Sequence, residues 1–507
     1  MREQRISGKR IMLHVSRVVA VGMAATGFVA GTHAQLQDWS NLGGNGRANG
    51  LVNVVGPDGV GSSDVLWEGG AFSYIAWNPV IEGRRVFVVR QNAFSPNPPA
   101  GDSRIYALDL DTGATLWTAD IPYEAGDWTT WIAGVKNGRV YASRSGNGGS
   151  VSAPVYCLDA ATGAVMWHTA GGSASVPRHE ISGGPYSGAV FASDGDLIVT
   201  STFAIQRIDS QTGQVLWNTP RTEQVGNTSG PVIEGNSVYI ADLIPGSGNR
   251  IAIRKIDATT GASLYRGPLL GGVLLHNTPY IGIDGRIYLP YTQNNNVNVD
   301  FLYSFTDTGQ SIIENWHVSS GGGGEFSRWG VGPDGSLYSM SWTGTQDSTA
   351  SGILQRLNAA TGAVIDSYEV PITGDYMQIH MAVDSRGVLY VSNGTAGGFG
   401  GGRLFSFNPD LSLRWEMPLP GNVNQGAPVL GTDGTLIVAS TDNFLRAYRS
   451  VPRCSSDINQ DGTVDGDDII AYFAAWDAAR LIADMDGNQT VDGDDVIIFF
   501  GLWDAGC

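Results

Sequence analysis

Short apolar runs that alternate with polar residues and end at glycine turns fill most of this chain. The segment 79–89 places a turn at Gly83 between two such runs, and the segments 231–240 and 280–289 repeat the arrangement. A period of two residues is typical of strands, and tight connections favour antiparallel pairing. The pattern therefore predicts an all-β fold of short strands as far as about residue 450.

A second motif recurs about every fifty residues. Its best copies, 109–117, 159–167 and 209–217, share the pattern Asp-x-x-Thr-Gly-x-x-x-Trp. We expect Thr-Gly to close a hairpin in which glycine supplies a positive φ. The aspartate would accept main-chain N–H groups across the turn, and the tryptophan would pack against the next repeat. Weaker copies follow at Asp257 to Tyr265, Asp307 to Trp316, Asn358 to Asp366 and Asn408 to Trp415.

Four strands per repeat make each repeat one blade of a β-propeller. Residues 71–417 supply seven complete blades, whereas 427–448 supply three strands that lack a fourth. The strand-like run 64–68 lies fifty residues before the motif of the first complete blade and would supply that fourth strand, which would close the ring and remove exposed sheet edges. We therefore predict an eight-bladed propeller, with seven blades as the alternative if one weak copy is absorbed.

The character of the chain changes after residue 450. Two copies of one loop, twenty-seven residues apart, place oxygen-bearing side chains at positions 1, 3, 5, 9 and 12, and position 7 offers a main-chain carbonyl. This spacing suits Ca²⁺, a hard cation that takes six to eight oxygen ligands. Gly462 fits the turn at position 6, whereas Gln489 requires another geometry there. The predicted ligands of two Ca²⁺ ions are Asp457, Asn459, Asp461, Thr463, Asp465 and Asp468, and Asp484, Asp486, Asn488, Thr490, Asp492 and Asp495.

Each loop runs into an apolar stretch that predicts a short helix. The two helices would pack face to face through these apolar stripes, giving a small all-α module beside the all-β propeller. The predicted stripes are Ile469, Ile470, Phe473 and Trp476, and Val496, Ile497, Phe500 and Trp503.

Negative charge is concentrated in this tail. The chain has a formal charge of −18, and residues 454–507 contain twelve aspartates and one arginine. Such a balance argues against nucleic acid or an anionic membrane as partner. Cys454 and Cys507 bracket the tail and would form a disulfide in an exported chain, with two free thiols as the alternative. Cys157 lies in a strand pattern and is expected to be a buried, small apolar residue.

The first 34 residues predict an export signal. A basic start is followed by the apolar run 18–30 and by Thr-His-Ala before Gln35, a small-x-small cleavage site. The alternative is an uncleaved anchor, but the apolar run is short for a membrane span. We expect a secreted protein, in the periplasm, on the cell surface or in the medium, with no transmembrane anchor after cleavage.

The Asp-x-x-x-Gly-x-x-x-Trp motif resembles the tryptophan-docking motif of quinoprotein, or PQQ-like, propeller repeats, over about residues 60–450. The resemblance extends to quinoprotein alcohol dehydrogenases and to a lipoprotein family that assists outer-membrane assembly. Family dehydrogenases hold pyrroloquinoline quinone and calcium in a central funnel, and many cap the quinone with two adjacent cysteines. This chain has no adjacent cysteine pair, and no stretch matches the family's calcium ligands. We therefore expect no quinone and assign no catalytic residue.

Three aromatic segments lie between the outer strand of one blade and the inner strand of the next. They are 127–131, 326–329 and 376–380. Such segments lie near the mouth of a propeller funnel, where aromatic and arginine side chains stack on a sugar or clasp a peptide. The alternative is packing of the inner strands.

The duplicated loop and helix, with aspartate at position 12 and a Gly-Cys ending, resembles a dockerin over residues 454–507. The resemblance implies docking to a cohesin-like or cell-envelope protein. Positions 10 and 11 carry recognition pairs in dockerins, and here they are Gly466-Asp467 and Gly493-Asp494, which depart from the usual Ser/Thr pairs. The partner therefore stays open.

Together these patterns predict three parts: a signal peptide (1–34), a propeller (35–450) and a calcium-binding module (454–507). We expect a non-catalytic binding or scaffold propeller that this module attaches to a cell surface or extracellular complex. One alternative is an enzyme, either a quinoprotein oxidoreductase or a polysaccharide-degrading propeller. The other is a purely structural surface component.

Overall fold

The computed structural model describes most of the chain from Trp39 onward. The described ranges, some with short internal gaps, are 39–59, 65–91, 103–169, 189–270, 278–292, 300–319, 329–343, 351–371, 380–393, 403–419, 428–449, 456–458, 464–477, 483–485 and 490–505. The predicted signal peptide and both Cys454 and Cys507 lie outside these residues. No helix of the described part is long and apolar enough to cross a membrane.

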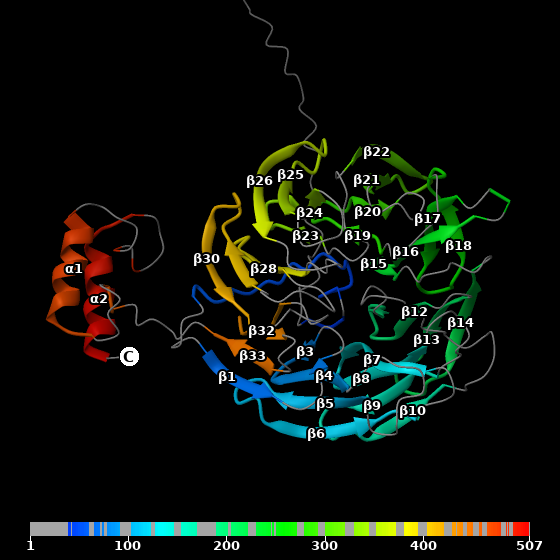
Figure 1. Cartoon of the computed structure of the whole chain (residues 1–507), viewed down its shortest axis with the longest axis horizontal. Helices are drawn as coiled ribbons and strands as arrows, with labels where there is room; N and C mark the ends of the chain where they lie inside the picture. Colours follow the sequence, from blue (N-terminus) through cyan, green and yellow to red (C-terminus); the bar gives the residue numbers. More distant parts are fainter. Residues whose placement is uncertain are drawn as a thin grey trace, which may run out of the picture. The chain divides into compact units, whose positions relative to one another are not determined.

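Eight antiparallel sheets surround a common axis (Figure 1). Blade 1 contains β2 (Tyr74–Ile75), β3 (Val80–Glu82), β4 (Arg85–Gln91), β5 (Ser103–Asp109) and β6 (Thr115–Asp120). Blade 2 contains β7 (Asp127–Lys136), β8 (Arg139–Gly146), β9 (Tyr156–Asp159) and β10 (Val165–His168). Blade 3 contains β11 (Val190–Phe191), β12 (Leu197–Thr200), β13 (Ala204–Ile208) and β14 (Val215–Pro220). Blade 4 contains β15 (Val232–Glu234), β16 (Ser237–Leu243), β17 (Ile251–Asp257) and β18 (Ser263–Arg266).

The second half of the ring repeats this plan. Blade 5 contains β19 (Tyr280–Ile281), β20 (Ile287–Thr292), β21 (Asp300–Asp307) and β22 (Ile312–Ser319). Blade 6 contains β23 (Gly330–Val331), β24 (Leu337–Thr343), β25 (Ser351–Leu357) and β26 (Val364–Pro371). Blade 7 contains β27 (His380–Val383), β28 (Leu389–Asn393), β29 (Arg403–Phe407) and β30 (Leu413–Pro418). Blade 8 contains β31 (Val429–Leu430), β32 (Leu436–Ala439) and β33 (Phe444–Tyr448).

Blade 8 takes its fourth strand from the other end of the propeller. β1 (Val65–Gly70) pairs antiparallel with β33, so that Val65 faces Tyr448 and Gly70 faces Phe444. The prediction of eight blades, one of them split, is therefore confirmed. Because the outer strand of blade 8 precedes blade 1 in the sequence, main-chain hydrogen bonds hold the ring shut.

Tryptophans of the outer strands join most blades to the next, as the repeat predicts. Trp117 on β6 donates its Nε1 hydrogen to the carbonyl oxygen of Ala160 in blade 2, at 3.1 Å. Its ring lies over Gly163, whose φ is 74°. The aspartate of the motif acts as expected: Asp109 Oδ1 accepts the N–H groups of Asp111 and Thr112. Equivalent indole bonds run from Trp167 to Ser210, Trp217 to Ala258 and Trp316 to Ala359.

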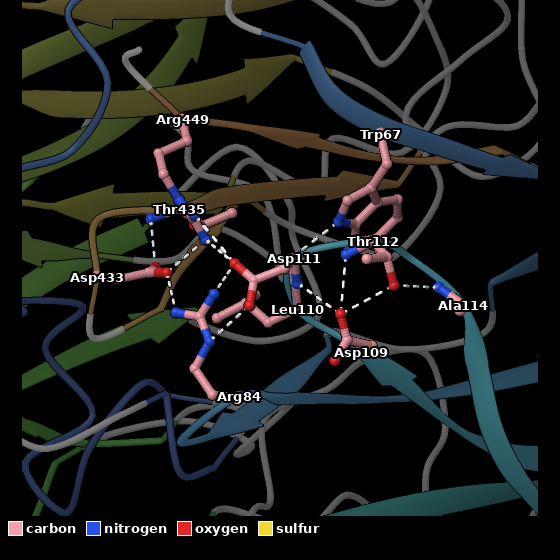
Figure 2. Close-up of polar contacts among 10 residues, drawn as sticks. All are labelled: Trp67, Arg84, Asp109, Leu110, Asp111, Thr112, Ala114, Asp433, Thr435 and Arg449. Atoms are coloured by element: carbon pink, nitrogen blue, oxygen red, sulfur yellow. Dashed lines mark hydrogen bonds and ion pairs between the residues drawn. The ribbon is translucent and has the colours of Figure 1, made fainter. Parts of the chain in front are cut away.

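The seam between blades 8 and 1 combines this docking with a cluster of charges (Figure 2). Trp67 on β1 donates to the Leu110 carbonyl oxygen at 2.8 Å. Beside it, Arg84 forms ion pairs with Asp111 and Asp433, and Arg449 forms ion pairs with the same two carboxylates. These four charged residues, which we call the closing clamp, come from blade 1 and blade 8, so they tie the two ends of the propeller together.

The seam between blades 4 and 5 has a polar cluster in place of the indole. Between blades 4 and 5, Tyr265 stands at the tryptophan position, and its hydroxyl donates to Asp307 Oδ1 at 2.6 Å. Tyr239 and Lys255 both donate to Asp307 Oδ2 at 2.6 Å. No side chain covers the corresponding Gly309, around which no atom lies within 4 Å of an added Cβ. Opposite charges and hydroxyl groups thus join this pair of blades, as an indole hydrogen bond does where Trp67, Trp117, Trp167, Trp217 and Trp316 stand.

The C-terminal part contains two helices, α1 (Gly466–Asp477) and α2 (Gly493–Ala505). They follow the two predicted loops. Within the described residues these are the α-helices of the chain, so the combination of an all-β propeller with a small all-α module is observed.

Candidate functional site

The helix pair is built around one stacked aromatic pair. The ring of Tyr472 on α1 lies parallel to that of Phe499 on α2, with centroids 4.0 Å apart and an angle of 6°. Both side chains are fully buried, together with Ala475 and Ala483. The predicted face-to-face packing of the helices is therefore confirmed.

The predicted apolar stripes are partly wrong. Ile470 and Ile497 are 69% and 71% exposed, although both stood in those stripes. The buried face of α1 carries Asp468, Tyr472 and Ala475, at spacings of four and three residues. Residue 470 stands two positions from Tyr472, which places it about 200° round the helix and therefore toward solvent. The remaining stripe residues pack at least partly against the core, except for the more exposed Phe473.

Each helix begins with a reciprocal cap formed by positions 9 and 12 of its loop. Asp465 Oδ1 accepts the N–H of Asp467, while Asp468 Oδ2 accepts the N–H of Asp465 at 3.0 Å. The second loop repeats this, since Asp495 Oδ2 accepts the N–H of Asp492 at 2.8 Å. This is a capping box built from aspartates, and it needs no metal to explain it.

The position-12 carboxylates are also well placed for a cation. Asp468 and Asp495 are fully buried, and each accepts the main-chain N–H of the residue three positions before it. Asp495 additionally accepts the N–H of Met485, near the start of the second loop, through Oδ1 at 2.7 Å. A buried carboxylate that reaches from a helix start across its own loop is the arrangement by which a final oxygen ligand closes a calcium loop.

Half of the predicted ligands belong to the described residues. These are Asp457, Asp465, Asp468, Thr490, Asp492 and Asp495. The other six lie outside the described residues: Asn459, Asp461, Thr463, Asp484, Asp486 and Asn488. Among the residues that the structure does describe, no group of three or more histidine, cysteine, aspartate or glutamate side chains is arranged to hold a metal ion.

At the centre of the propeller, residues 39–58 form a segment that we call the N-terminal strap. It contacts all eight blades in chain order before the chain enters β1. Six main-chain N–H groups of the ring donate to carbonyl oxygens of the strap. The pairs are Ile81 to Trp39, Val135 to Ser40, Ile233 to Gly46, Ile281 to Arg47, Val331 to Asn49 and Val383 to Gly50. Blade 3 is reached by Asn41 Nδ2, which donates to the Ala189 carbonyl oxygen, and Gly434 of blade 8 lies against the Val55 carbonyl group.

Sequence analysis did not identify this strap. Its one local signal is the spacing of Asn41, Asn45 and Asn49, four residues apart among glycines. Each Oδ1 accepts the N–H two residues further along the chain, which forms three successive Asx turns. Asparagines at this spacing turn the chain repeatedly, but the partners of these turns in the ring cannot be read from the sequence.

Two tryptophans of the predicted aromatic segments belong to the described residues and pack inside the propeller. Trp131 in β7 is buried, and buried Trp329 stacks on Tyr280 with centroids 5.9 Å apart and an angle of 15°. The alternative of inner-strand packing is confirmed for these two residues. The segments 326–328 and 376–379 lie outside the described residues. Cys157 is buried in β9, as predicted, and burial raises the pKa of its thiol to about 12.

Comparison with known proteins finds a family match for part of the propeller. Residues 101–271 match the family described as outer membrane protein assembly factor BamB, so PQQ-like repeats are present in this part of the chain. No curated protein matches the chain.

Three solved structures match the chain at low sequence identity. A europium-containing methanol dehydrogenase is 12% identical to this chain. The match covers 80% of this chain and 89% of the dehydrogenase, with a TM-score of 0.52, which shows a common fold. BamB from Moraxella catarrhalis is 16% identical, over 76% of this chain and 99% of its own, with a TM-score of 0.46. A quinohemoprotein alcohol dehydrogenase from Pseudomonas putida HK5 is 13% identical, over 82% and 80%, with a TM-score of 0.35.

Proposed function

We propose that this chain is an exported binding protein. Its propeller presents a rigid face to a glycan, a peptide or a protein, and its C-terminal helix pair attaches it, with calcium, to a cohesin-like or cell-envelope protein. The observation that carries the proposal is the pair of buried carboxylates, Asp468 and Asp495, which stand at position 12 of the two predicted loops and accept the N–H groups of Asp465 and Asp492.

The calcium part rests on charge and on donor chemistry. Residues 454–507 contain twelve aspartates and one arginine, and the aspartates repel one another unless cations neutralise them. The predicted ligands supply oxygen atoms alone, which Ca²⁺ prefers. Asp465 and Asp468 would hold one ion and Asp492 and Asp495 the other, together with the loop residues that precede each pair. The ion would supply binding energy that favours the folded helix pair.

The propeller part rests on rigidity. Indole docking joins most neighbouring blades, the closing clamp joins the ends, and the strap contacts the inner strands of all blades but blade 8, which it meets at the β31–β32 turn. A rigid ring that carries connecting loops is the usual frame on which binding residues are displayed. The exposed Ile470 and Ile497 offer apolar contact area for a partner of the helix pair.

Calorimetric titration of calcium into the chelator-treated mature chain tests the metal claim. Two ions are expected. D468N and D495N should each bind one, because asparagine keeps the size of the side chain but removes the charge. Asp504 is exposed on α2 outside both loops, so D504N is the matched control and should bind two. Absence of calcium-dependent heat in the wild-type chain would end the claim.

Attachment has a separate test. The immobilised mature chain should retain cell-envelope proteins in calcium and lose them in chelator, and the double variant D468N/D495N should retain none under either condition. Retention that ignores both calcium and the double substitution would contradict a calcium-dependent attachment, even if the metal itself binds.

A second candidate is a quinone-dependent oxidoreductase, which the shared fold with a europium-containing methanol dehydrogenase favours. We assign no residue of this chain to the quinone. Reconstitution with pyrroloquinoline quinone and either calcium or a lanthanide should give dye-linked alcohol oxidation if this candidate is right. A chain that retains no quinone absorbance after gel filtration and oxidises no alcohol would leave the binding function standing alone.

A further inference from the structure

We infer that the N-terminal strap is a peptide ligand bound in cis. The inner edges of the blades form a circular site for a turn-rich segment of asparagine and glycine residues, and residues 39–58 occupy that site. The inference predicts that the strap stays bound to the ring after its covalent connection is cut. It is independent of the ligand or partner that the loops bind.

The main chain of the ring provides the first part of this site. Six N–H groups donate to strap carbonyl oxygens over distances of 2.7 to 3.1 Å. All six belong to equivalent residues, because each faces the first apolar residue of the second strand of its blade, as Ile81 faces Val86 and Val383 faces Leu389. These groups lie on the strand edge that points away from the second strand, so the ring offers them as a row. Pairing an extended segment with free strand edges is a recurrent mode of peptide recognition.

Asparagine side chains provide selectivity. Asn41, Asn45 and Asn49 are all buried, and Asn45 Nδ2 donates to Asn49 Oδ1 at 2.8 Å. Asn49 Nδ2 donates to the carbonyl oxygen of Ile281 in blade 5 at 2.9 Å. A buried amide that loses such partners costs free energy, so another residue at position 49 would weaken the complex.

Close approach excludes larger residues at three glycines. A Cβ atom at Gly46 would lie 2.8 Å from Ile233 Cγ2, and one at Gly56 would lie 2.4 Å from the hydroxyl oxygen of Tyr390. Gly50 has a φ of +68°, and its Cβ would lie 3.0 Å from the Met381 carbonyl oxygen. The ring therefore fits the glycines of this particular sequence and would not accept a larger residue at these three positions.

Both ends of the strap are anchored. Trp39 is buried at one end. At the other end Asp58 Oδ1 accepts hydrogen bonds from Arg386 at 2.6 Å and Arg414 at 2.8 Å. Between them, Arg47 binds Glu234 through two hydrogen bonds of 2.6 and 2.7 Å. Ion pairs at the middle and at the end of the strap thus fix its position along the ring.

The connection to the ring argues that the strap belongs to its own molecule. Only residues 59–64 separate Asp58, which blade 7 holds, from β1, which completes the adjacent blade 8. A strap donated by a second copy would have to leave its own β1 behind over the same short link. Exchange between copies is therefore an outcome for the test to detect.

The test uses the full mature chain with a protease site inserted between Gly59 and Val65. The protein is folded, cut and passed through gel filtration under native conditions. The strap peptide should co-elute with the ring, and denaturation should then release it. Loss of the peptide from a ring whose near-ultraviolet circular dichroism is unchanged would overturn the inference. A dimeric mass by light scattering before cutting would overturn the assignment in cis.

Variants separate specific recognition from simple entrapment. In the cut protein, N49A should release the peptide about tenfold faster than wild type. Asn53 is an exposed strap residue, so N53A is the matched control and should release it at the wild-type rate. Equal release from N49A and N53A would show that the buried amide takes no part, and would overturn the claimed selectivity.

Discussion

The indole ring of Trp67 lies so close over Gly113 that a Cβ atom added there would come within 2.6 Å of the ring. The same 2.6 Å approach recurs where Trp117 covers Gly163 and where Trp217 covers Gly261. Each of these glycines also has a positive φ near 70°. The glycine of the repeat therefore serves two purposes, because it permits the turn and makes room for the tryptophan of the preceding blade.

The substitution G163A should accordingly cost more than the turn alone requires. We expect a loss of about 3 kcal/mol in the free energy of unfolding, composed of about 1 kcal/mol for alanine at positive φ and the remainder for the clash with Trp117. Urea unfolding measures it. Gly309 provides the control, since its φ is +84° but nothing lies within 4 Å of its added Cβ. G309A should lose about 1 kcal/mol, and equal losses for both variants would contradict the docking argument.

The closing clamp predicts a salt-dependent contribution to stability. R449A leaves Asp111 and Asp433 with Arg84 as their shared partner. We expect a loss of about 1 kcal/mol at low ionic strength that shrinks in 0.5 M salt, because these groups are partly exposed and screened. Arg286 pairs with Asp284 inside a single hairpin of blade 5. R286A should therefore change the unfolding midpoint less than R449A does, and the reverse order would refute the clamp.

The polar seam between blades 4 and 5 predicts acid sensitivity. Burial would raise the pKa of Asp307, but hydrogen bonds from Lys255, Tyr239 and Tyr265 outweigh it and lower that pKa to about 2. Since the pKa of Asp307 in the folded protein lies below the ordinary aspartate pKa of 3.8, the stabilisation is present above about pH 4 and is lost as the pH falls toward 2. D307N should remove this part of the acid dependence of urea unfolding. D284N, in a surface hairpin, should leave it in place.

Calcium removal should loosen the contacts of two tryptophans in the helix pair. Trp476 Nε1 donates to the Asp492 carbonyl oxygen and Trp503 Nε1 to that of Asp465, both at 3.2 Å, so each helix holds the loop of the other. We expect chelation to shift the tryptophan emission to longer wavelength and calcium to restore it. The double variant W476F/W503F should lose the response. If the double variant shows a shift of equal size, the emission change does not come from Trp476 and Trp503.

Thiol counting checks the three cysteines together. Burial raises the pKa of Cys157 to about 12, so this thiol should not react with a disulfide reagent at pH 8 in the folded protein. If Cys454 and Cys507 form the predicted disulfide, the native chain shows no reactive thiol, the denatured chain one, and the denatured and reduced chain three. Three thiols without reduction would exclude the disulfide.

The repeats were predictable because their determinants are local. The turn, the aspartate that caps it and the tryptophan lie within nine residues, from Asp109 to Trp117. The split blade followed from counting strands. The strap was not predictable, since its partners lie from about forty to more than three hundred residues away and its polar residues read as a loop. The prediction placed Ile470 in the helix core because isoleucine is apolar. The helix instead turns Tyr472 toward the core and leaves Ile470 exposed.

The split blade has a consequence for biosynthesis. Val65 and Tyr448 are neighbours in the sheet, although one is made near the start of the propeller and the other at its end. During synthesis β1 therefore has no partner strand until nearly four hundred further residues have been made, and the strap completes its contact with blade 8 equally late. A truncated chain that ends before β33 cannot pair β1 and therefore exposes unpaired strand edges. Such edges distinguish an unfinished propeller from a closed one and can be recognised by cellular quality control.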